Sequence, residues 1–406
     1  MKRILGKYTE AQVMIDDIDE ATEKQIQSMV NNDAFENPVV IMVDCHAGKG
    51  SVIGFTMKMG RKIIPNVSGV DLNCGVLSIK TDCELIPDLA KLNSDIRCSV
   101  PMGHTIFNTT EWGRCISSDW RESFPQEEAL ESICKRVGIK FLYALNSLGT
   151  LGGGNHFIEI GQDTRGFIWI TVHSGSRKLG LNIANYWQKL AISKWYRKYD
   201  VLADTIVATC KAQKREKEIE GILKSLPICN EEMIALEDEE DIEGYLADVA
   251  FTQIYAHTNR RWIIDRVLDL LGAAELDSIE SVHNYIDMED GFIRKGAIRS
   301  YIGERMVIPF NMRDGLLICE GKSNPDWNFS APHGAGRILS RNEAKKRLDL
   351  DEFKSQMASV YSTSVCAGTL DEAPAAYKDS VLIERLIEPT VKVIERVKPI
   401  LNLKAV

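Results

Sequence analysis

Five histidines fall in short glycine-rich or polar loops beside stretches whose composition predicts β-strands. They occur in "VDCHAGKG", "GGGNHFIEI", "TVHSGSRKLG", "SVHNYID" and "PHGAGR", at His46, His156, His173, His283 and His333. A single loop histidine is more often a hydrogen-bonded structural residue, but five of the chain's seven in one kind of setting indicate a shared role. Imidazole nitrogens bind borderline metals and act as bases or nucleophiles near neutral pH.

A carboxylate and a thiol accompany these histidines. The segment "GVDLNCGV" places Asp71 and Cys74 three positions apart between glycines, so a tight turn could direct both at one point. Cys74 alone would be interpreted as a small buried hydrophobic residue, but a buried Asp71 needs partners. Carboxylate, thiolate and imidazole ligands together suit Mn²⁺, Zn²⁺, Fe²⁺ or Co²⁺ better than Mg²⁺ or Ca²⁺.

Glycines and cationic side chains in the same loops indicate an anionic ligand. The segments "LGGGNH", "HSGSRKLG" and "HGAGR" offer backbone N–H groups beside Arg177, Lys178 and Arg337. Such groups commonly bind phosphate. The chain has neither a GxxxxGK[ST] loop nor a GxGxxG fingerprint after a strand. The residues alone therefore indicate metal-dependent phosphoryl or nucleotidyl chemistry.

The elements that must position these residues predict an α+β protein. Apolar, β-branched stretches such as "PVVIMVD", "SVIGFTM", "GVLSIKT", "GFIWITVH" and "GLLICEG" predict strands, and "TEKQIQSMVNN" predicts a helix. Between about 183 and 264 the pattern becomes helical, and the last residues predict a helix followed by an extended tail. With no repeat or linker, we expect residues 1–406 to form one large mixed α/β body with a helical insertion.

Composition sets the class of protein. With 406 residues and 44% hydrophobic content, the chain can bury a large core. No apolar run is long enough to span a bilayer, and the N-terminus turns acidic before a signal-peptide core could form, so we expect a cytoplasmic protein. The net charge of −9 argues against a general nucleic-acid coat but allows a local basic cleft. The ten cysteines include no CxxC pair, which argues against a zinc ribbon.

From about residue 40 onward, the motifs resemble those of the RtcB-type RNA-splicing ligases. The shared set is "DxHxGKG", "GVDxxCG", "LGxLGGGNHFIE", "HSGSR", "HNY", "RKGA", "APHGAGRxxSR" and "AYKD". The resemblance implies a single ligase domain that joins an RNA 3′-phosphate or 2′,3′-cyclic phosphate to a 5′-hydroxyl. It also implies GTP as co-substrate and a pair of Mn²⁺ ions, in RNA repair or tRNA splicing.

The resemblance also assigns site residues. Its metal ligands would be Asp71, Cys74, His156, His173 and His283, with Cys74 bridging. His333 would be the nucleophile that takes GMP, and Arg177, Lys295 and Arg337 would act at the reacting phosphates. The nucleotide contacts would be Asn155, Glu159, Asn311, His333, Gly334, Ala335, Gly336, Arg337 and Lys404. Asp44 and His46 would support the metal ligands.

The chain departs from the family pattern in two places. Where many members carry "IPGSMGTAS", this chain has "IPFNMRDGL" over residues 308–316, so Asn311 and Leu316 stand where serines would contact the base. The chain ends in "LKAV", whereas the pattern ends in "KG". These changes predict altered nucleotide contacts with intact metal and nucleophile motifs.

Two other functions use the same residues. A metal-dependent phosphatase or nuclease would use the ligands to activate water, but it would leave His333 without a role. A catalytically weak RNA-binding relative would be expected to lose a ligand or the nucleophile, and the motifs keep both. The sequence leaves open whether an activating protein partner takes part, and it predicts no membrane contact.

Overall fold

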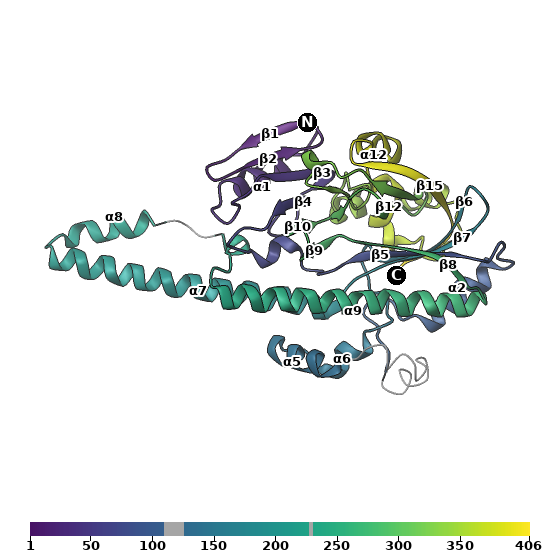
Figure 1. The fold of residues 1–406 in the computed structure, drawn as a ribbon, viewed down its shortest axis with the longest axis horizontal. Coiled ribbons are helices and arrows are strands. Elements are labelled where there is room, and N and C mark those ends of the chain that lie inside the picture. Colours follow the sequence, from purple (N-terminus) through teal and green to yellow (C-terminus); the bar gives the residue numbers. More distant parts are fainter. Residues whose placement is uncertain (109–125, 227–229) are drawn as a thin grey trace.

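A computed structural model describes residues 1–108, 126–226 and 230–406 of the chain (Figure 1). Its first sheet has six strands in the order β1-β2-β3-β4-β10-β9. These are β1 (Lys2–Leu5), β2 (Glu10–Val13), β3 (Val39–His46), β4 (Ile53–Lys58), β10 (Phe292–Lys295) and β9 (Asn284–Ile286). Only β2 and β3 pair in parallel among these neighbours. A short pair, β11 (Ala297–Arg299) with β14 (Ser330–Pro332), lies separately.

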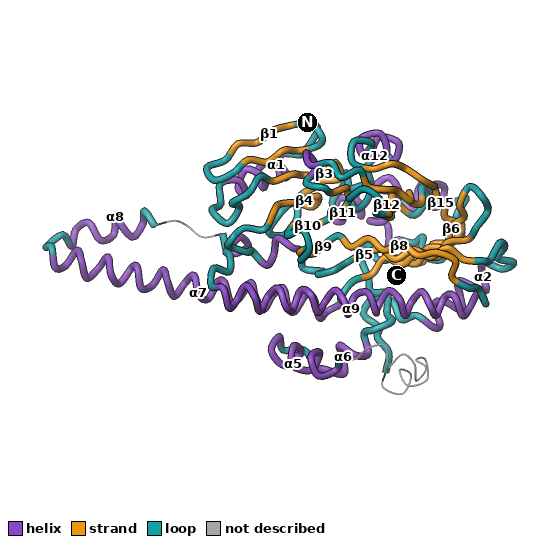
Figure 2. The backbone as a smooth tube through the Cα atoms, viewed as in Figure 1, coloured by secondary structure: helices purple, strands orange, loops and turns teal. Residues whose placement is uncertain are grey.

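The second sheet has seven antiparallel strands in the order β12-β13-β15-β6-β7-β5-β8. They are β12 (Arg305–Asn311), β13 (Gly315–Gly321), β15 (Val391–Leu403), β6 (Phe157–Asp163), β7 (Ile168–Ser174), β5 (Gly75–Thr81) and β8 (Glu275–Val282). Every residue of β7 is buried, because helices cover one face of this sheet and other elements the second. In Figure 2 the long helices form a layer beneath the strands, and shorter helices lie among and above them.

Two long helices, α7 (Arg177–Ala212) and α9 (Glu239–Leu271), run side by side beneath the sheets (Figure 1). The predicted helical insertion is confirmed, although its helices begin at Arg177 and end at Leu271. The far half of α7 projects from the body with α8 (Ile219–Lys224). No helix among the described residues is long and apolar enough to cross a membrane.

Shorter helices fill the remaining chain. They are α1 (Glu20–Val30), α2 (Leu89–Ser99), α5 (Glu127–Val137), α6 (Phe141–Asn146), α10 (Arg341–Arg347), α11 (Leu350–Gln356) and α12 (Ser380–Ile387). Short 3₁₀ helices lie at Pro65–Ser68, Glu216–Glu218, Glu231–Met233, Pro325–Trp327, Ala367–Glu372 and Pro374–Ala376. The predicted α+β class is confirmed.

Apolar packing fixes α9 against the second sheet. Ile263 and Val267 of α9 lie in one buried cluster with Ile79, Ile170 and Val172 of β5 and β7. Gly272 ends α9 in the left-handed conformation (φ 61°), which glycine adopts without strain. This packing fixes the position of α9, which also contacts residues next to the candidate site.

Candidate metal and nucleotide site

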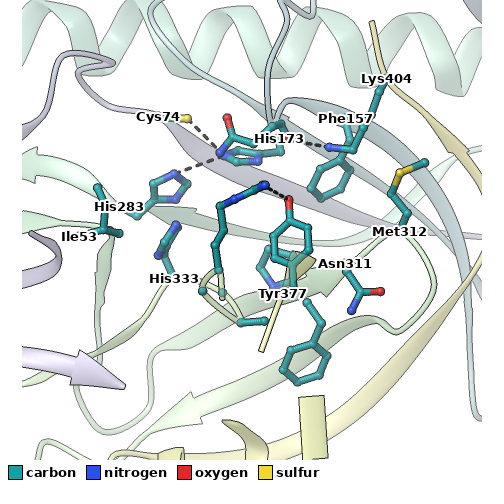
Figure 3. Close-up of a pocket in the computed structure, with 18 of the residues that line it drawn as sticks. Ile53, Cys74, Phe157, His173, His283, Asn311, Met312, His333, Tyr377 and Lys404 are labelled. Atoms are coloured by element: carbon teal, nitrogen blue, oxygen red, sulfur yellow. Dashed lines mark hydrogen bonds between the residues drawn. The ribbon is translucent and has the colours of Figure 1, made fainter. Parts of the chain in front are cut away.

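A pocket opens at one edge of the second sheet and collects most of the predicted site residues (Figure 3). The predicted residues that line it are His46, Asp71, Cys74, Asn155, Glu159, His173, His283, Asn311, His333, Gly334, Ala335, Gly336, Arg337 and Lys404. His156 lies directly behind, in contact with Asp71 and Cys74. Arg177 and Lys295 are not among the lining residues.

Strand register explains why ligands distant in sequence meet. Gly75 at the start of β5 pairs with Ser174 at the end of β7 and with Val282 at the end of β8. Phe157 at the start of β6 pairs with His173. Because these neighbours are antiparallel, the starts of β5 and β6 meet the ends of β7 and β8. Four predicted metal ligands lie at these strand ends. Cys74 and His156 directly precede β5 and β6, His173 is the second-last residue of β7, and His283 directly follows β8.

The ligand atoms form two groups that share Cys74. Its Sγ lies 3.2 Å from His173 Nε2, which in turn lies 3.3 Å from His283 Nε2. The same Sγ lies 3.4 Å from His156 Nε2, and that nitrogen lies 3.0 Å from Asp71 Oδ2. The cluster Cys74–His173–His283 and the cluster Asp71–Cys74–His156 could each hold an ion.

The donor set and its spacing fit transition-metal ions. Metal–nitrogen distances of about 2.0–2.1 Å in a tetrahedral shell place neighbouring ligand atoms about 3.4 Å apart, close to the separations found here. Burial, with neighbouring histidines adding to it, lowers the pKa of His173 and His283 well below the usual value, so both imidazoles stay neutral and can donate a lone pair. His156 donates Nδ1–H to Leu151 O (2.9 Å), which leaves Nε2 free to coordinate.

A buried arginine of α9 supports this cluster from behind. The Arg260 side chain has no exposed surface, and its Nη1 donates to Asn73 O (2.9 Å) and Ser174 O (2.8 Å). These carbonyls belong to the residues adjacent to Cys74 and His173. Arg260 Nε donates to Glu280 Oε1 (2.8 Å), which balances its charge. The sequence analysis placed this arginine only within an amphipathic helix.

Replacing Arg260 by methionine is expected to destabilise the protein by about 3 kcal/mol, because a carboxylate and two carbonyls lose their buried donor. Urea unfolding of the metal-free protein measures this change. Arg261→Met is the matched control, since Arg261 is partly exposed and pairs with Asp265 and Glu275. We expect it to cost less than about 1 kcal/mol. Equal costs for the two variants would contradict the supporting role of Arg260.

His333 lies in the loop after β14 and is held by Asp44. Its Nδ1 lies 2.7 Å from Asp44 Oδ2, and the Asp44 side chain is fully buried. A carboxylate only accepts hydrogen bonds, so Nδ1 carries the proton and Nε2 keeps a lone pair. The His333 ring lies 4.7 Å from that of His283 between centroids, next to the metal cluster. Asp44 thus contacts the expected nucleophile and not a metal ligand.

The neighbouring segments fix this arrangement. His46 donates Nδ1–H to Asp44 O (3.1 Å), and burial lowers the pKa of His46 to about 4, so it stays neutral. Gly336 has φ 72° and lies so close to Asp44 that an added Cβ would stand 2.3 Å from its carbonyl oxygen. The "HGAGR" loop therefore needs glycine at 336 to bring His333 onto Asp44.

The deep end of the pocket holds Glu159. The side chain is 3% exposed, and its Oε2 accepts a hydrogen bond from Asn402 Nδ2 (2.9 Å). Burial raises the pKa of Glu159 to about 8, although Asn402 and Lys404 act to lower it. Lys404 Nζ donates to Asn155 O (3.1 Å) and to Glu372 Oε2 (2.8 Å).

Of the two positions that depart from the family pattern, Asn311 lies at the pocket as expected and Leu316 does not. Asn311 lines the pocket, but its Oδ1 accepts the N–H groups of Arg313 and Asp314 in the β12–β13 turn. Leu316 is 1% exposed and packs in an apolar cluster with Trp169 and Val397. The expectation that Leu316 faces the base is therefore wrong, because its side chain points to the core of the sheet.

Three predicted phosphate-binding cations already have partners. Arg177 donates to Thr150 Oγ1 (3.1 Å) and Gly103 O (3.2 Å), under the glycine loop. Lys295 Nζ donates to the carbonyls of Lys49 and Ser51, and burial lowers its pKa to about 7. Arg337 lines the pocket, where it contacts Glu372 and the Tyr377 hydroxyl.

Comparison with known proteins agrees with this geometry. The family model described as "tRNA-splicing ligase RtcB" matches residues 25–405. The chain belongs to the RtcB family. It is 30% identical over 404 residues to the RNA-splicing ligase RtcB of Escherichia coli, with 90% of each chain covered. The tRNA-splicing ligase RtcB of Nanoarchaeum equitans is 25% identical over 453 residues, covering 90% of this chain and 88% of its own. The predicted RtcB family is confirmed.

The RtcB site includes residues that the sequence analysis did not assign. Among them are Phe157, Arg341, Tyr377 and Asn402 in the lining, and Glu372 beside it. Arg341 and Tyr377 belong to the quoted motifs "APHGAGRxxSR" and "AYKD", so a closer inspection of those motifs could have found them. Asn402 lies in an extended tail with no motif, and nothing in the sequence singles it out.

Proposed function

We propose that this RtcB-family protein is a GTP- and Mn²⁺-dependent RNA ligase that works through a covalent GMP–His333 intermediate. It joins RNA ends that carry a 3′-phosphate or 2′,3′-cyclic phosphate to 5′-hydroxyl ends, in RNA repair or tRNA splicing. One observation supports this above the others: His333 is held by Asp44 with Nε2 free, next to two ligand groups that share Cys74. A water-activating phosphatase or nuclease would need the ligands but not this histidine.

The pair of ions would be held by the two ligand groups of Asp71, Cys74, His156, His173 and His283. Bound there, Mn²⁺ supplies positive charge against the charge that develops on the reacting phosphate. The protein contributes neutral imidazoles, a sulfur ligand common to both groups, and strand ends fixed by Arg260.

His333 carries the covalent step. Its Nε2 lone pair attacks the α-phosphorus of GTP, a P–N bond forms, and the bond to the oxygen bridging to the β-phosphate breaks. Pyrophosphate leaves with that electron pair. The Nδ1 proton stays hydrogen-bonded to Asp44, which stabilises the positive charge that the ring gains.

Other residues would bind the phosphates and the base. The backbone of Gly334, Ala335 and Gly336 and the side chains of Asn155 and Arg337 line the pocket around His333. Glu159, Asn311 and Lys404 would contact the guanine. Arg177 and Lys295 are proposed to act on phosphates once these displace their present hydrogen-bond partners. RNA would bind through a local basic cleft, so its affinity should fall with salt.

Mass spectrometry of the intact protein after incubation with GTP and Mn²⁺ tests the proposal. We expect the mass of one GMP to be added, and peptide mapping should place it on His333. Joining of a labelled RNA with a 3′-phosphate to one with a 5′-hydroxyl should follow. Hydrolysis of RNA or GTP without a retained adduct would instead support the phosphatase or nuclease.

The preference for GTP over ATP is expected to increase with pH up to about pH 8. In the empty pocket Glu159 is protonated below its pKa of about 8. The N1–H and 2-amino group of guanine favour the carboxylate, so GTP binding releases a proton and its affinity rises by up to about tenfold per pH unit. The protonated acid can donate to adenine N1, so ATP affinity falls as the proton is lost.

Affinities of both nucleotides measured between about pH 6 and about pH 8 test this linkage. Both nucleotides carry the same triphosphate, so the effect of its ionisation cancels in the ratio of the two affinities. Glu159→Gln should make the ratio independent of pH. A constant ratio in the unmodified protein would show that Glu159 does not change its protonation when the base binds.

A further inference from the structure

Asn402 lies beside Glu159 at the deep end of the pocket. The two residues are directly paired across β15 and β6, and Asn402 is 1% exposed. Its Nδ2 donates to Glu159 Oε2, and this hydrogen bond suits the carboxylate that Glu159 becomes when guanine binds, because a carboxylate only accepts. The other end of this amide, Oδ1, is buried and has no hydrogen-bond partner among the described residues.

Nearby groups do not satisfy this oxygen. Lys404, two residues further along the chain and just past the end of β15, donates to Asn155 O and Glu372. The amide of Asn311 is engaged by its own turn, and Leu316 faces the apolar core. A buried carbonyl oxygen without a donor is unfavourable, so a ligand that brings an N–H group to Asn402 gains affinity.

We propose that Asn402 is a specificity-determining residue that recognises the nucleotide base together with Glu159. This inference rests on the proposed function, since it concerns the nucleotide bound in the same pocket. Asn402 Oδ1 accepts from the 2-amino group of guanine, while the free carboxylate oxygen of Glu159 accepts from N1–H. Two adjacent acceptors match a base edge with two adjacent donors, and adenine does not offer such an edge.

The role of Asn402 separates into two parts that an experiment can distinguish. Through Nδ2 it holds Glu159 in place, which would affect any purine that bonds to Glu159 at N1. Through Oδ1 it reads the 2-amino group, which would affect guanine alone. Inosine triphosphate (ITP) keeps the N1–H of GTP and lacks the 2-amino group, so the GTP/ITP affinity ratio isolates the second part.

Nucleotide affinities are to be measured in a His333→Ala background, so that binding is not followed by transfer of GMP. With Asn402 present, GTP should bind about tenfold tighter than ITP, because ITP leaves the buried oxygen unpaired. Asn402→Leu should bring the ratio close to one, mainly through weaker GTP binding. An unchanged ratio, with both affinities lowered together, would overturn the inference and leave Asn402 only the task of holding Glu159.

Controls separate the other causes. Asn402→Ser is a second variant in case leucine disturbs the strand pairing, and thermal unfolding checks the folding of both. Gln162→Ala changes an exposed residue on the same pair of strands, opposite Lys398, and should keep the ratio. If the unmodified protein forms no GMP adduct, the proposed function fails. If it forms the adduct and the ratio survives in Asn402→Leu, only the present inference fails.

Discussion

His333→Ala is expected to form no GMP adduct at all while keeping its fold and its metal content. The imidazole supplies the only nitrogen proposed to bond to phosphorus. Its removal from a loop deletes a contact to Asp44 without opening an apolar core. The metal ligands lie on other segments, so Mn²⁺ binding should persist. Intact-mass spectrometry after GTP and Mn²⁺, with metal analysis of the same sample, measures both outcomes.

Asp44→Asn provides the companion measurement. The neutral amide of asparagine stabilises the positively charged imidazole ring less than a carboxylate does. The adduct should therefore still form, but about 10²–10⁴-fold more slowly. The adduct should remain on His333. A GMP adduct retained in His333→Ala would contradict the assignment of the nucleophile, and unchanged kinetics in Asp44→Asn would contradict the positioning by Asp44.

Cys74→Ser should remove both metal sites, since the two ligand groups share this sulfur. Serine stays protonated where a bridging thiolate is needed, so we expect most of the bound metal and activity to be lost. His156→Ala and His283→Ala each affect one group and should lower the metal content by about half. Metal analysis after dialysis against Mn²⁺-free buffer measures these differences.

Cys134→Ser is the matched control for this experiment. Cys134 is also a buried free thiol, but it lies on α5 in an apolar cluster. Its substitution should cost some stability and leave the metal content unchanged. If Cys74→Ser behaves like Cys134→Ser, with only a modest loss of stability, then Cys74 is a packing residue and the shared-ligand arrangement is wrong.

The residues that the structure gathers at the candidate site were largely predictable from the sequence. Their motifs contain glycines and polar residues that a regular strand or helix would not require. The residues concerned are Cys74, His173, His283 and His333, and the structure brings them together. Apolar, β-branched stretches predicted most of the strands that carry them. The charged strand β8 was missed because its side chains alternate little in polarity at the edge of the sheet.

The sequence could not predict contacts between side chains that depend on strand register and on the direction in which each side chain points. Asp44 was expected beside the metals, yet the loop after β14 brings His333 to the side chain that Asp44 presents from β3. Leu316 was expected at the base, yet strand alternation turns it to the core. Asn402 is opposite Glu159 only because β15 enters the sheet between β13 and β6.

The position of β15 in the sheet determines when the pocket can assemble during synthesis of the chain. β15 is the last of the described strands to leave the ribosome, yet it joins β12 and β13 to the other four strands of the seven-stranded sheet. Until it emerges, Glu159 has no Asn402 beside it and Glu372 has no Lys404. A nascent chain therefore cannot assemble the end of the pocket proposed to bind the base until β15 and Lys404 have emerged.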